Sequence, residues 1–179
     1  MIYLFLAQGF EEVEAICPLD LLRRAGLEVK TVGVGGEIIT GAHGITVRAD
    51  MTDSMYRDEK PEMIILPGGM PGTKNLDSSP VVDAALGAAV RCGGFIGAIC
   101  AAPSILGKRG LLRGKRAICY PGFEKYLDGA ILADKRVVRD GKIITAAGPG
   151  VALQFGLELI RAIRGNEAAE TVRAAVLAD

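Results

Sequence analysis

Cys100 is the residue of this chain whose sequence surroundings most favour nucleophilic chemistry. It follows the apolar run 95–99, which predicts a buried strand, and precedes Ala101-Ala102-Pro103, where a first helical turn tolerates proline. A cysteine in a sharp strand-to-helix turn resembles a nucleophile elbow. The positive end of the helix dipole is expected to lower the pKa of its thiol and to favour the thiolate. The alternative is an inert core cysteine, because free cysteines are among the most buried residues.

Glu14 is the acidic residue best placed to act together with Cys100. It lies in a predicted helix from Glu11 to Gly26, on the same face as Leu21, so its carboxyl can point inward. Partial burial and a nearby thiolate would both raise the pKa of this carboxyl, and a protonated Glu14 could then donate a hydrogen bond to the sulfur. The alternative is that the glutamates of this first turn are solvated and simply favoured by the helix dipole.

Backbone N–H groups at other strand ends could complete such a site. Pro67-Gly68-Gly69 follows the apolar run 63–66, and a glycine cluster there can present N–H groups to an anion, although an ordinary turn is equally consistent with it. The N–H groups of Gly69 and Ala101 could stabilise an oxyanion. The further residues predicted to line the same pocket are Gly68, Tyr120, Gly148, Pro149 and His43. For His43, which lies in a predicted hairpin loop, an exposed turn residue is the alternative.

The elements that position these residues are indicated by hydrophobic periodicity. Short apolar strands alternate with helices, which predicts an α/β fold with a mostly parallel sheet covered on both faces. Strands are expected at 2–7, 27–32, 63–66, 95–99 and 116–119, with hairpins at 37–47 and 137–145. Helices are expected at 11–26, 79–90, from 103, at 151–164, and at the end of the chain, with Asn166 as its cap. Ligands of such sheets bind beyond the carboxyl ends of the strands, so the residues above should gather on one rim.

Length and composition restrict the classes of protein to which the chain can belong. With 179 residues, half of them hydrophobic, a single domain over 1–179 is expected. The 21 basic residues balance the 21 acidic ones and there is no Trp, so no nucleic-acid partner is expected. The opening MIYLFLAQ is too short to span a bilayer and lacks a basic flank, which predicts a cytoplasmic protein without membrane contact.

The chain shows no pattern typical of a cofactor site. The first turn reads Gln8-Gly9-Phe10-Glu11 instead of G-x-G-x-x-G, and its carboxylate would repel a pyrophosphate. The four cysteines form no C-x-x-C pair and are expected to be free thiols. Because His43 is the single histidine, no metal is expected either.

Four motifs, in their order and spacing, resemble the ThiJ/PfpI superfamily, and the similarity is closest to the branch of the Parkinson-disease-associated protein deglycase. The motifs are GFEEVE (9–14), LPGG (66–69), AICAAP (98–103) and GPG (148–150), and the similarity covers essentially the whole chain. The resemblance implies a flavodoxin-like three-layer sandwich and a homodimer. The helix at 11–25 is a candidate interface because it carries Asp20, Arg23 and Arg24 beside apolar positions, although a solvated face is the more common explanation of such charges. The resemblance also implies a nucleophilic, oxidation-sensitive Cys100 with Glu14 as its partner, and an oxyanion hole at Gly69 and Ala101.

The resemblance implies two kinds of function. The first is a cofactor-free enzyme of the glyoxalase or protein deglycase type, in which the thiolate adds to a small carbonyl substrate or a glycated side chain while Glu14 moves protons. The second is a non-enzymatic oxidative-stress sensor or chaperone whose Cys100 oxidises to a sulfinic acid.

Two positions depart from patterns within the superfamily. Ala101 stands where the peptidase branch has a histidine, which counts against a Cys-His peptidase. Tyr120 stands where the closest relatives have a histidine near the cysteine. Tyrosine can donate a hydrogen bond, but with a pKa of about 10 it is a poor base near neutral pH. A mechanism that requires that histidine is therefore in doubt for this chain.

Overall fold

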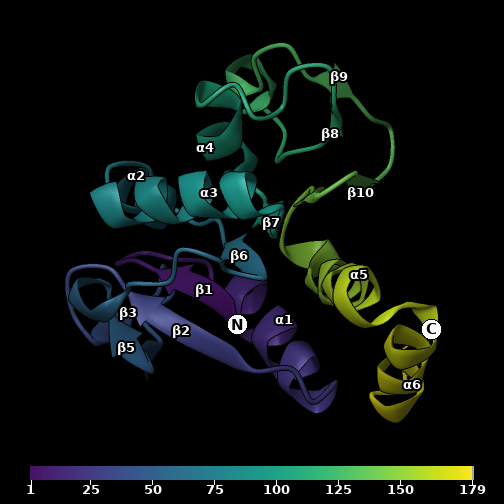
Figure 1. Cartoon of the computed structure of the whole chain (residues 1–179), viewed down its shortest axis with the longest axis horizontal. Coiled ribbons are helices and arrows are strands. Elements are labelled where there is room, and N and C mark those ends of the chain that lie inside the picture. Colours follow the sequence, from purple (N-terminus) through teal and green to yellow (C-terminus); the bar gives the residue numbers. More distant parts are fainter. Residues whose placement is uncertain (179) are drawn as a thin grey trace.

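The apolar runs of the sequence form a central seven-stranded sheet in the computed structural model, which describes residues 1–178 (Figure 1). The strand order is β10-β11-β7-β6-β1-β2-β5, and every neighbouring pair is parallel except β10 and β11. The strands are β1 (Ile2–Leu6), β2 (Val29–Gly33), β5 (Met51–Thr52), β6 (Met63–Leu66), β7 (Phe95–Ile99), β10 (Val137–Asp140) and β11 (Ile143–Ala146). Two smaller sheets pair β3 (Ile38–Thr40) with β4 (Thr46–Arg48) and β8 (Arg116–Ala117) with β9 (Ile131–Leu132).

Helices cover both faces of this sheet, so the fold has three layers. One face is covered by α1 (Glu12–Arg24), α5 (Ala152–Arg164) and α6 (Asn166–Ala175), and the other by α2 (Gly72–Asp77), α3 (Pro80–Cys92) and α4 (Pro103–Lys108). Successive side chains of a strand point to opposite faces, and accordingly Leu4 packs in the first of these cores and Phe5 in the second. The predicted α/β sandwich with a mostly parallel sheet is confirmed.

The strand order explains why the carboxyl edge of the sheet can hold a site. β1 and β6 are adjacent, although the chain passes through β2 and β5 between them. The crossovers on the two sides of this point leave a crevice at the strand ends, where ligands bind in open α/β sheets. The turns after β1, β6 and β7 therefore lie side by side.

Several local predictions need correction. The strand expected at 116–119 ends at Ala117 and pairs with β9 outside the central sheet, because the N–H of Ile118 donates to Thr145 Oγ1 instead of continuing a ladder (3.0 Å). Asn166 does not cap α6: its Oδ1 accepts a hydrogen bond from Arg161 Nε, and the N-cap position is Gly165.

Two short segments also differ from the expectation. Helix α2 follows the glycine-rich turn directly, where no helix was expected. The segment 50–60, expected to be a polar loop that can hold one helical turn, forms such a turn, the 3₁₀ turn η1 (Asp53–Met55), but it also contributes edge strand β5. Further 3₁₀ turns are η2 (Glu124–Tyr126) and η3 (Pro149–Val151).

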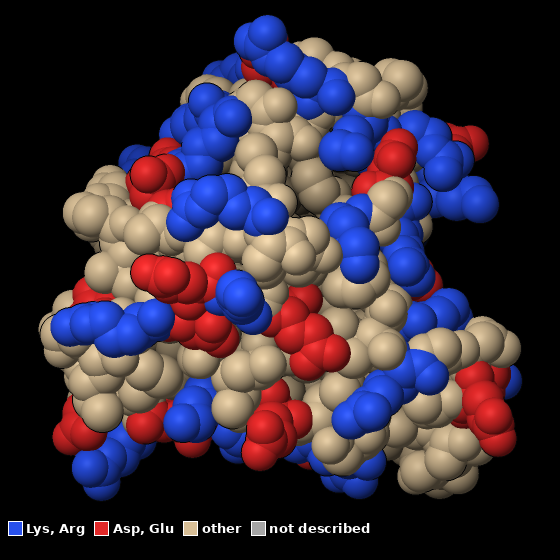
Figure 2. Space-filling view, in the orientation of Figure 1, with Lys and Arg blue, Asp and Glu red and all other residues tan. Residues whose placement is uncertain are grey.

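Charge is unevenly distributed along this neutral chain. Residues 108 to 142 hold ten Lys and Arg but only four Asp and Glu. Figure 2 accordingly shows mostly basic side chains over the upper part of the molecule, where Figure 1 places the segment from α4 to β10. No helix among residues 1–178 is long and apolar enough to cross a membrane.

Candidate active site

Cys100 occupies a strained turn at the carboxyl end of β7. Its φ is +65°, a left-handed conformation that costs a non-glycine residue of the order of 1–3 kcal/mol. Two backbone hydrogen bonds hold it there: its N–H donates to the carbonyl of Ala146 (2.8 Å), and its carbonyl accepts from the N–H of Tyr120 (2.7 Å). The turn places the half-buried thiol at the rim of the sheet, as in a nucleophile elbow.

The carboxyl group of Glu14 is completely buried at the same rim. Its Oε2 accepts a hydrogen bond from the N–H of Gly68 (2.9 Å), whereas Oε1 has no hydrogen-bond partner among the described residues. The start of α1 is tied to the end of β6, because the N–H of Glu11 donates to the carbonyl of Gly68 (2.9 Å). A buried oxygen without a donor favours the protonated carboxyl, which turns an unpaired acceptor into a donor.

Gly68 allows the acid and the thiol to meet. A Cβ on this glycine would lie 2.6 Å from Glu14 Oε2 and 3.1 Å from Cys100 Sγ, so a side chain there would displace one of them. The carboxyl of Glu14 and the thiol of Cys100 are therefore neighbours across this glycine, and the backbone N–H groups of Gly69 and Ala101 favour negative charge on the sulfur. Residues from the ends of β1, β6 and β7 thus converge on one sulfur atom.

The two groups of this pair shift each other's pKa. Burial raises the pKa of Glu14 to about 7, although its hydrogen bonds with Cys100 and Gly68 act in the opposite direction. Burial also raises the pKa of Cys100 to about 12, and the charge of Glu14 and the hydrogen bond to it add to the effect. The N–H groups of Ala101 and Gly69 lower the pKa of the thiol but do not offset these causes.

The expectation of a lowered thiol pKa is therefore wrong while Glu14 is ionised. The predicted cause was the dipole of the following helix, but α4 has only six residues, and desolvation together with a carboxylate outweighs it. Because the two groups are coupled, the first proton lost near pH 7 belongs to the pair. The single negative charge that remains can reside on Glu14 or, with the proton on Oε1, on the sulfur.

Of the remaining predicted pocket residues, Tyr120 and Gly148 lie close to each other at the elbow. The Tyr120 ring is 3.1 Å from the position that a Cβ on Gly148 would take, and the side chain is exposed at the rim. Pro149 is exposed at the start of the 3₁₀ turn η3, and no hydrogen bond links it to Cys100.

His43 contacts the start of α1 and not the sulfur. Its ring is 68% exposed, with Nδ1 2.9 Å from Glu12 Oε2 and 3.5 Å from Glu11 Oε1, and its backbone N–H donates to Glu12 Oε1 (2.8 Å). The side chain of Glu12 is itself buried and fills the space over Gly41, where a Cβ would clash with it. The acid therefore holds the β3–β4 loop against α1. A sequence separation of 31 residues concealed this contact.

Among residues 1–178, one group of side chains has ligand atoms close enough together to hold a metal ion. It consists of Glu11, Glu12 and His43. One oxygen each of Glu11 and Glu12 and a nitrogen of His43 lie within 4.8 Å of one another. The imidazole–carboxylate hydrogen bond accounts for this arrangement without an ion. Protonated His43 would satisfy both carboxylates, and these neighbours raise the pKa of His43, first through the hydrogen bond with Glu12.

Glu12→Gln is expected to loosen the β3–β4 loop. Burial alone would raise the pKa of Glu12, but the hydrogen bonds from His43 and Ile45 outweigh it, so the pKa lies below its ordinary value and the carboxylate is the stabilising form. The variant should lose about 1 kcal/mol of unfolding free energy at pH 7, the order of one charge-assisted hydrogen bond that is partly screened by solvent.

Urea unfolding at two pH values measures this effect. The contribution of a carboxylate with a lowered pKa is present at neutral pH and disappears as the pH falls through its folded-state pKa, so wild type and variant should converge in acid. Glu37→Gln, which removes an exposed partner of Arg48, is the matched control and should change the stability little. Equal losses for both variants, or a difference that persists in acid, would contradict the assignment.

Comparisons with known proteins agree with this geometry. A sequence profile described as the DJ-1/PfpI family matches residues 1–162. Protein dj-1beta of Drosophila melanogaster is 36% identical over 175 residues, covering 96% of this chain and 94% of that protein. A Caenorhabditis elegans protein named glutathione-independent glyoxalase DJR-1.2 is 34% identical over 158 residues, covering 88% of this chain and 84% of that protein.

Solved structures show the same architecture. The structure described as oxidized Toxoplasma gondii DJ-1 superposes with a TM-score of 0.95 at 35% identity, covering 99% of this chain and 97% of that one. The Drosophila melanogaster DJ-1beta crystal structure superposes with a TM-score of 0.93 at 35% identity, with the same coverage of the two chains.

Proposed function

Because this chain belongs to the DJ-1/PfpI family, we propose that it is a cofactor-free enzyme that uses Cys100 to convert small reactive carbonyl compounds. The observation that carries the proposal is the completely buried Glu14 carboxyl, which meets the Cys100 thiol across Gly68. The similarity to a protein named as a glutathione-independent glyoxalase supports an aldehyde substrate of the methylglyoxal type.

The first step is addition of the thiolate to the aldehyde carbon of methylglyoxal. The reactive form of the pair carries its proton on Glu14 and its charge on Cys100. As the C–S bond forms, the carbonyl electron pair moves to oxygen, where the N–H groups of Gly69 and Ala101 stabilise the negative charge. Glu14 then gives its proton to that oxygen, which yields a neutral hemithioacetal and a carboxylate.

The second part of the proposed reaction regenerates the thiol of Cys100 and releases lactate. The Glu14 carboxylate removes the proton from the former aldehyde carbon, and reprotonation at the neighbouring carbon turns the enediol into a thioester of Cys100. Hydrolysis of that thioester by water gives lactate and the free thiol, so the net reaction adds one water to methylglyoxal. Glu14 carries every proton transfer, and Tyr120 serves at most as a hydrogen-bond donor at the rim.

Lactate formation from methylglyoxal, in buffer free of glutathione, tests the proposal. The rate should be proportional to the concentration of protein. A rate equal to that of buffer alone would contradict it. The same reaction on glycated side chains extends the proposal to protein deglycation, which is checked by the release of lactate from methylglyoxal-treated peptides.

A second candidate function, an oxidative-stress sensor or chaperone, rests on the same sulfur. A sulfinate at Cys100 would keep the N–H donors of Gly69 and Ala101 and could accept a proton from Glu14, which would stabilise that oxidation state. Peptide mass spectrometry after mild peroxide treatment tests it. Cys100 should gain two oxygen atoms before Cys92, the exposed thiol of the chain, does so. Earlier oxidation of Cys92 would contradict the sensor.

We further propose that residues 1–179 form one domain that acts in the cytoplasm as a homodimer. The four cysteines are all free thiols, as expected in a reducing compartment. Val13 and Ile16 of α1 and Ile45 of the neighbouring loop are exposed apolar side chains that a second copy of the chain could cover. Sedimentation equilibrium of the purified protein measures the mass of the assembly, and a single-chain mass would contradict the dimer.

A further inference from the structure

Tyr120 is an aromatic residue whose backbone is bonded directly to the Cys100 elbow. Its N–H donates to the carbonyl of Cys100 (2.7 Å), so the turn that presents the sulfur also sets the position of Tyr120. The ring lies against Gly148, with Cδ2 3.1 Å and Cε2 3.6 Å from the place of a Cβ on that glycine. Two residues earlier, the carbonyl of Ala146 accepts the N–H of Cys100 (2.8 Å). These contacts hold the ring beside the segment to which the elbow is bonded.

The packing of the protein does not account for the exposed part of this ring. Tyr120 is 46% exposed, and its hydroxyl has no hydrogen-bond partner within residues 1–178. Tyr126, another exposed tyrosine, differs in this respect, because Nζ of Lys108 and of Lys125 lie 5.5 Å and 5.1 Å from the centre of its ring. Tyr120 has no cation or aromatic ring of the described chain against it. Its free surface is therefore open to a ligand at the rim.

The other groups at this rim favour an uncharged, apolar ligand. Met70 is 43% exposed and directly follows Gly69, whose N–H favours negative charge on the sulfur. The ionisable neighbours of the sulfur are acidic, since Glu14 is buried beside it and the charge of Glu11 acts on Glu14. Within residues 1–178, no lysine or arginine forms an ion pair with either acid, and the basic side chain nearest to Glu11 is His43 (3.5 Å). An anionic substituent on the substrate would be repelled here.

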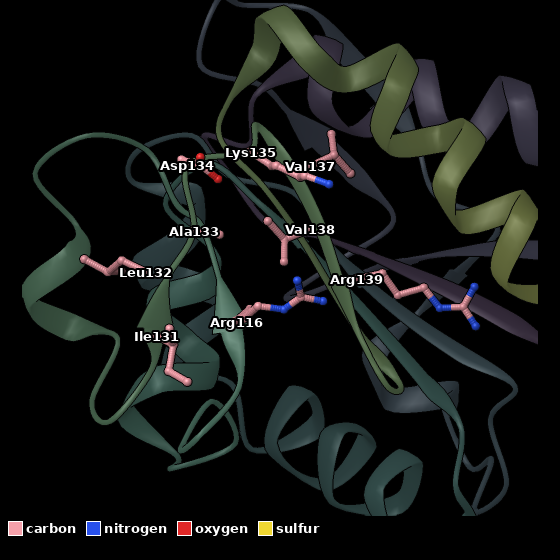
Figure 3. Close-up of a pocket in the computed structure, with 9 residues that line it drawn as sticks. All are labelled: Arg116, Ile131, Leu132, Ala133, Asp134, Lys135, Val137, Val138 and Arg139. Atoms are coloured by element: carbon pink, nitrogen blue, oxygen red, sulfur yellow. The ribbon is translucent and has the colours of Figure 1, made fainter.

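The hollow between the β8–β9 pair and β10 does not offer the same selectivity (Figure 3). It measures about 370 Å³, and the exposed side chains of Ile131 and Leu132 belong to its lining. Arg116 and Asp134 line it as well, so charges of both signs are present there. Within residues 1–178, none of its lining residues is hydrogen-bonded to Cys100. A group bound in this hollow would therefore not act on the sulfur.

We infer that Tyr120 is a specificity-determining residue that selects α-ketoaldehydes with a flat, uncharged aryl group on the ketone carbon. The inference rests on the proposed function, because it assigns a substrate class to the same sulfur. Once the aldehyde carbon is bonded to Cys100, the ketone substituent would extend over the rim and stack on the Tyr120 ring. Met70 would add apolar contact, since thioethers pack favourably against aromatic rings. This role is separate from proton transfer, which Glu14 carries.

Phenylglyoxal and methylglyoxal test this selectivity, because they differ only in the group on the ketone carbon. Addition of one water gives mandelate from the first and lactate from the second, and the ratio of the two kcat/KM values measures the preference. In Tyr120→Ala the ratio of phenylglyoxal to methylglyoxal should fall about tenfold, the order of one lost aromatic pair. Tyr120→Phe keeps the ring and should keep the ratio. Tyr126→Ala, which removes an exposed tyrosine far along the chain from the elbow contacts, is the control and should also keep it.

Alkylation of Cys100 by phenacyl bromide and by bromoacetone gives a second readout that needs no turnover. The sulfur displaces bromide from both reagents, and peptide mass spectrometry follows the two rates. Their ratio should fall in Tyr120→Ala by a similar factor and stay unchanged in Tyr120→Phe and Tyr126→Ala. Unchanged ratios in Tyr120→Ala, or an equal fall in Tyr126→Ala, would overturn the inference even if lactate forms normally. The expected alkylation ratios without product from either aldehyde would instead contradict the proposed enzyme and support the aryl contact at Tyr120.

Discussion

Cys100→Ala is expected to lower lactate formation from methylglyoxal to the rate of buffer alone. The sulfur is the atom that forms the covalent bond to substrate, and no neighbouring side chain can replace it. Loss of a nucleophile that works with a proton carrier costs a factor of about 10⁴ to 10⁶, so the residual rate should fall below detection.

Alanine suits this test because it has the same backbone preferences as cysteine at a φ of +65°, so the elbow should be retained. The unfolding temperature of the variant should stay within a few degrees of wild type. Cys92→Ala is the matched control: it removes an exposed thiol outside the site and should keep full activity. Wild-type activity in Cys100→Ala, or its loss in Cys92→Ala, would contradict the proposed nucleophile.

Glu14→Gln is expected to lower the rate by about 10²- to 10⁴-fold, the usual contribution of a general acid–base group. The amide keeps the shape of the side chain and can still donate to the sulfur, but it cannot accept a proton from the hemithioacetal carbon. The variant should fold normally. The substitution removes a buried carboxyl group whose pKa is raised in the folded protein. Such a group destabilises the folded state increasingly as the pH rises above the pKa that it has in the unfolded chain. At pH 8 the variant should therefore be as stable as wild type or more stable.

The pH profile distinguishes a proton carrier from a merely structural residue. In wild type, kcat/KM should rise as the pH passes through about 7, where the pair loses its first proton, and then level off. In Glu14→Gln this inflection should disappear. Iodoacetamide should alkylate Cys100 faster in Glu14→Gln than in wild type, although the activity of the variant is lower. The reason is that loss of the Glu14 charge lowers the pKa of the thiol from about 12. An unchanged inflection, or parallel losses of activity and alkylation, would argue against the proposed role.

The sequence by itself determined the fold class and the order of the parts. Runs such as Met63–Leu66 and Phe95–Ile99 are short and apolar throughout, which specifies strands buried on both faces of a parallel sheet. Parallel strands place the turns that follow them at one edge, so the order of the strands and turns along the chain is enough to expect Glu14, Gly68 and Cys100 at the same rim. Membership of the DJ-1/PfpI family could likewise be predicted from four motifs.

The tertiary structure alone decided the electrostatics of the thiol, whereas the raised pKa of Glu14 could be expected from its partial burial. The raised pKa of Cys100 follows from desolvation and from a carboxylate that approaches over Gly68, neither of which is encoded near residue 100. The attachment of Glu12 to the loop of His43 likewise depends on distant elements meeting. Local sequence patterns specify backbone conformation and which side is buried, whereas a pKa depends on every charge and dipole within a few ångströms, whatever its place in the chain.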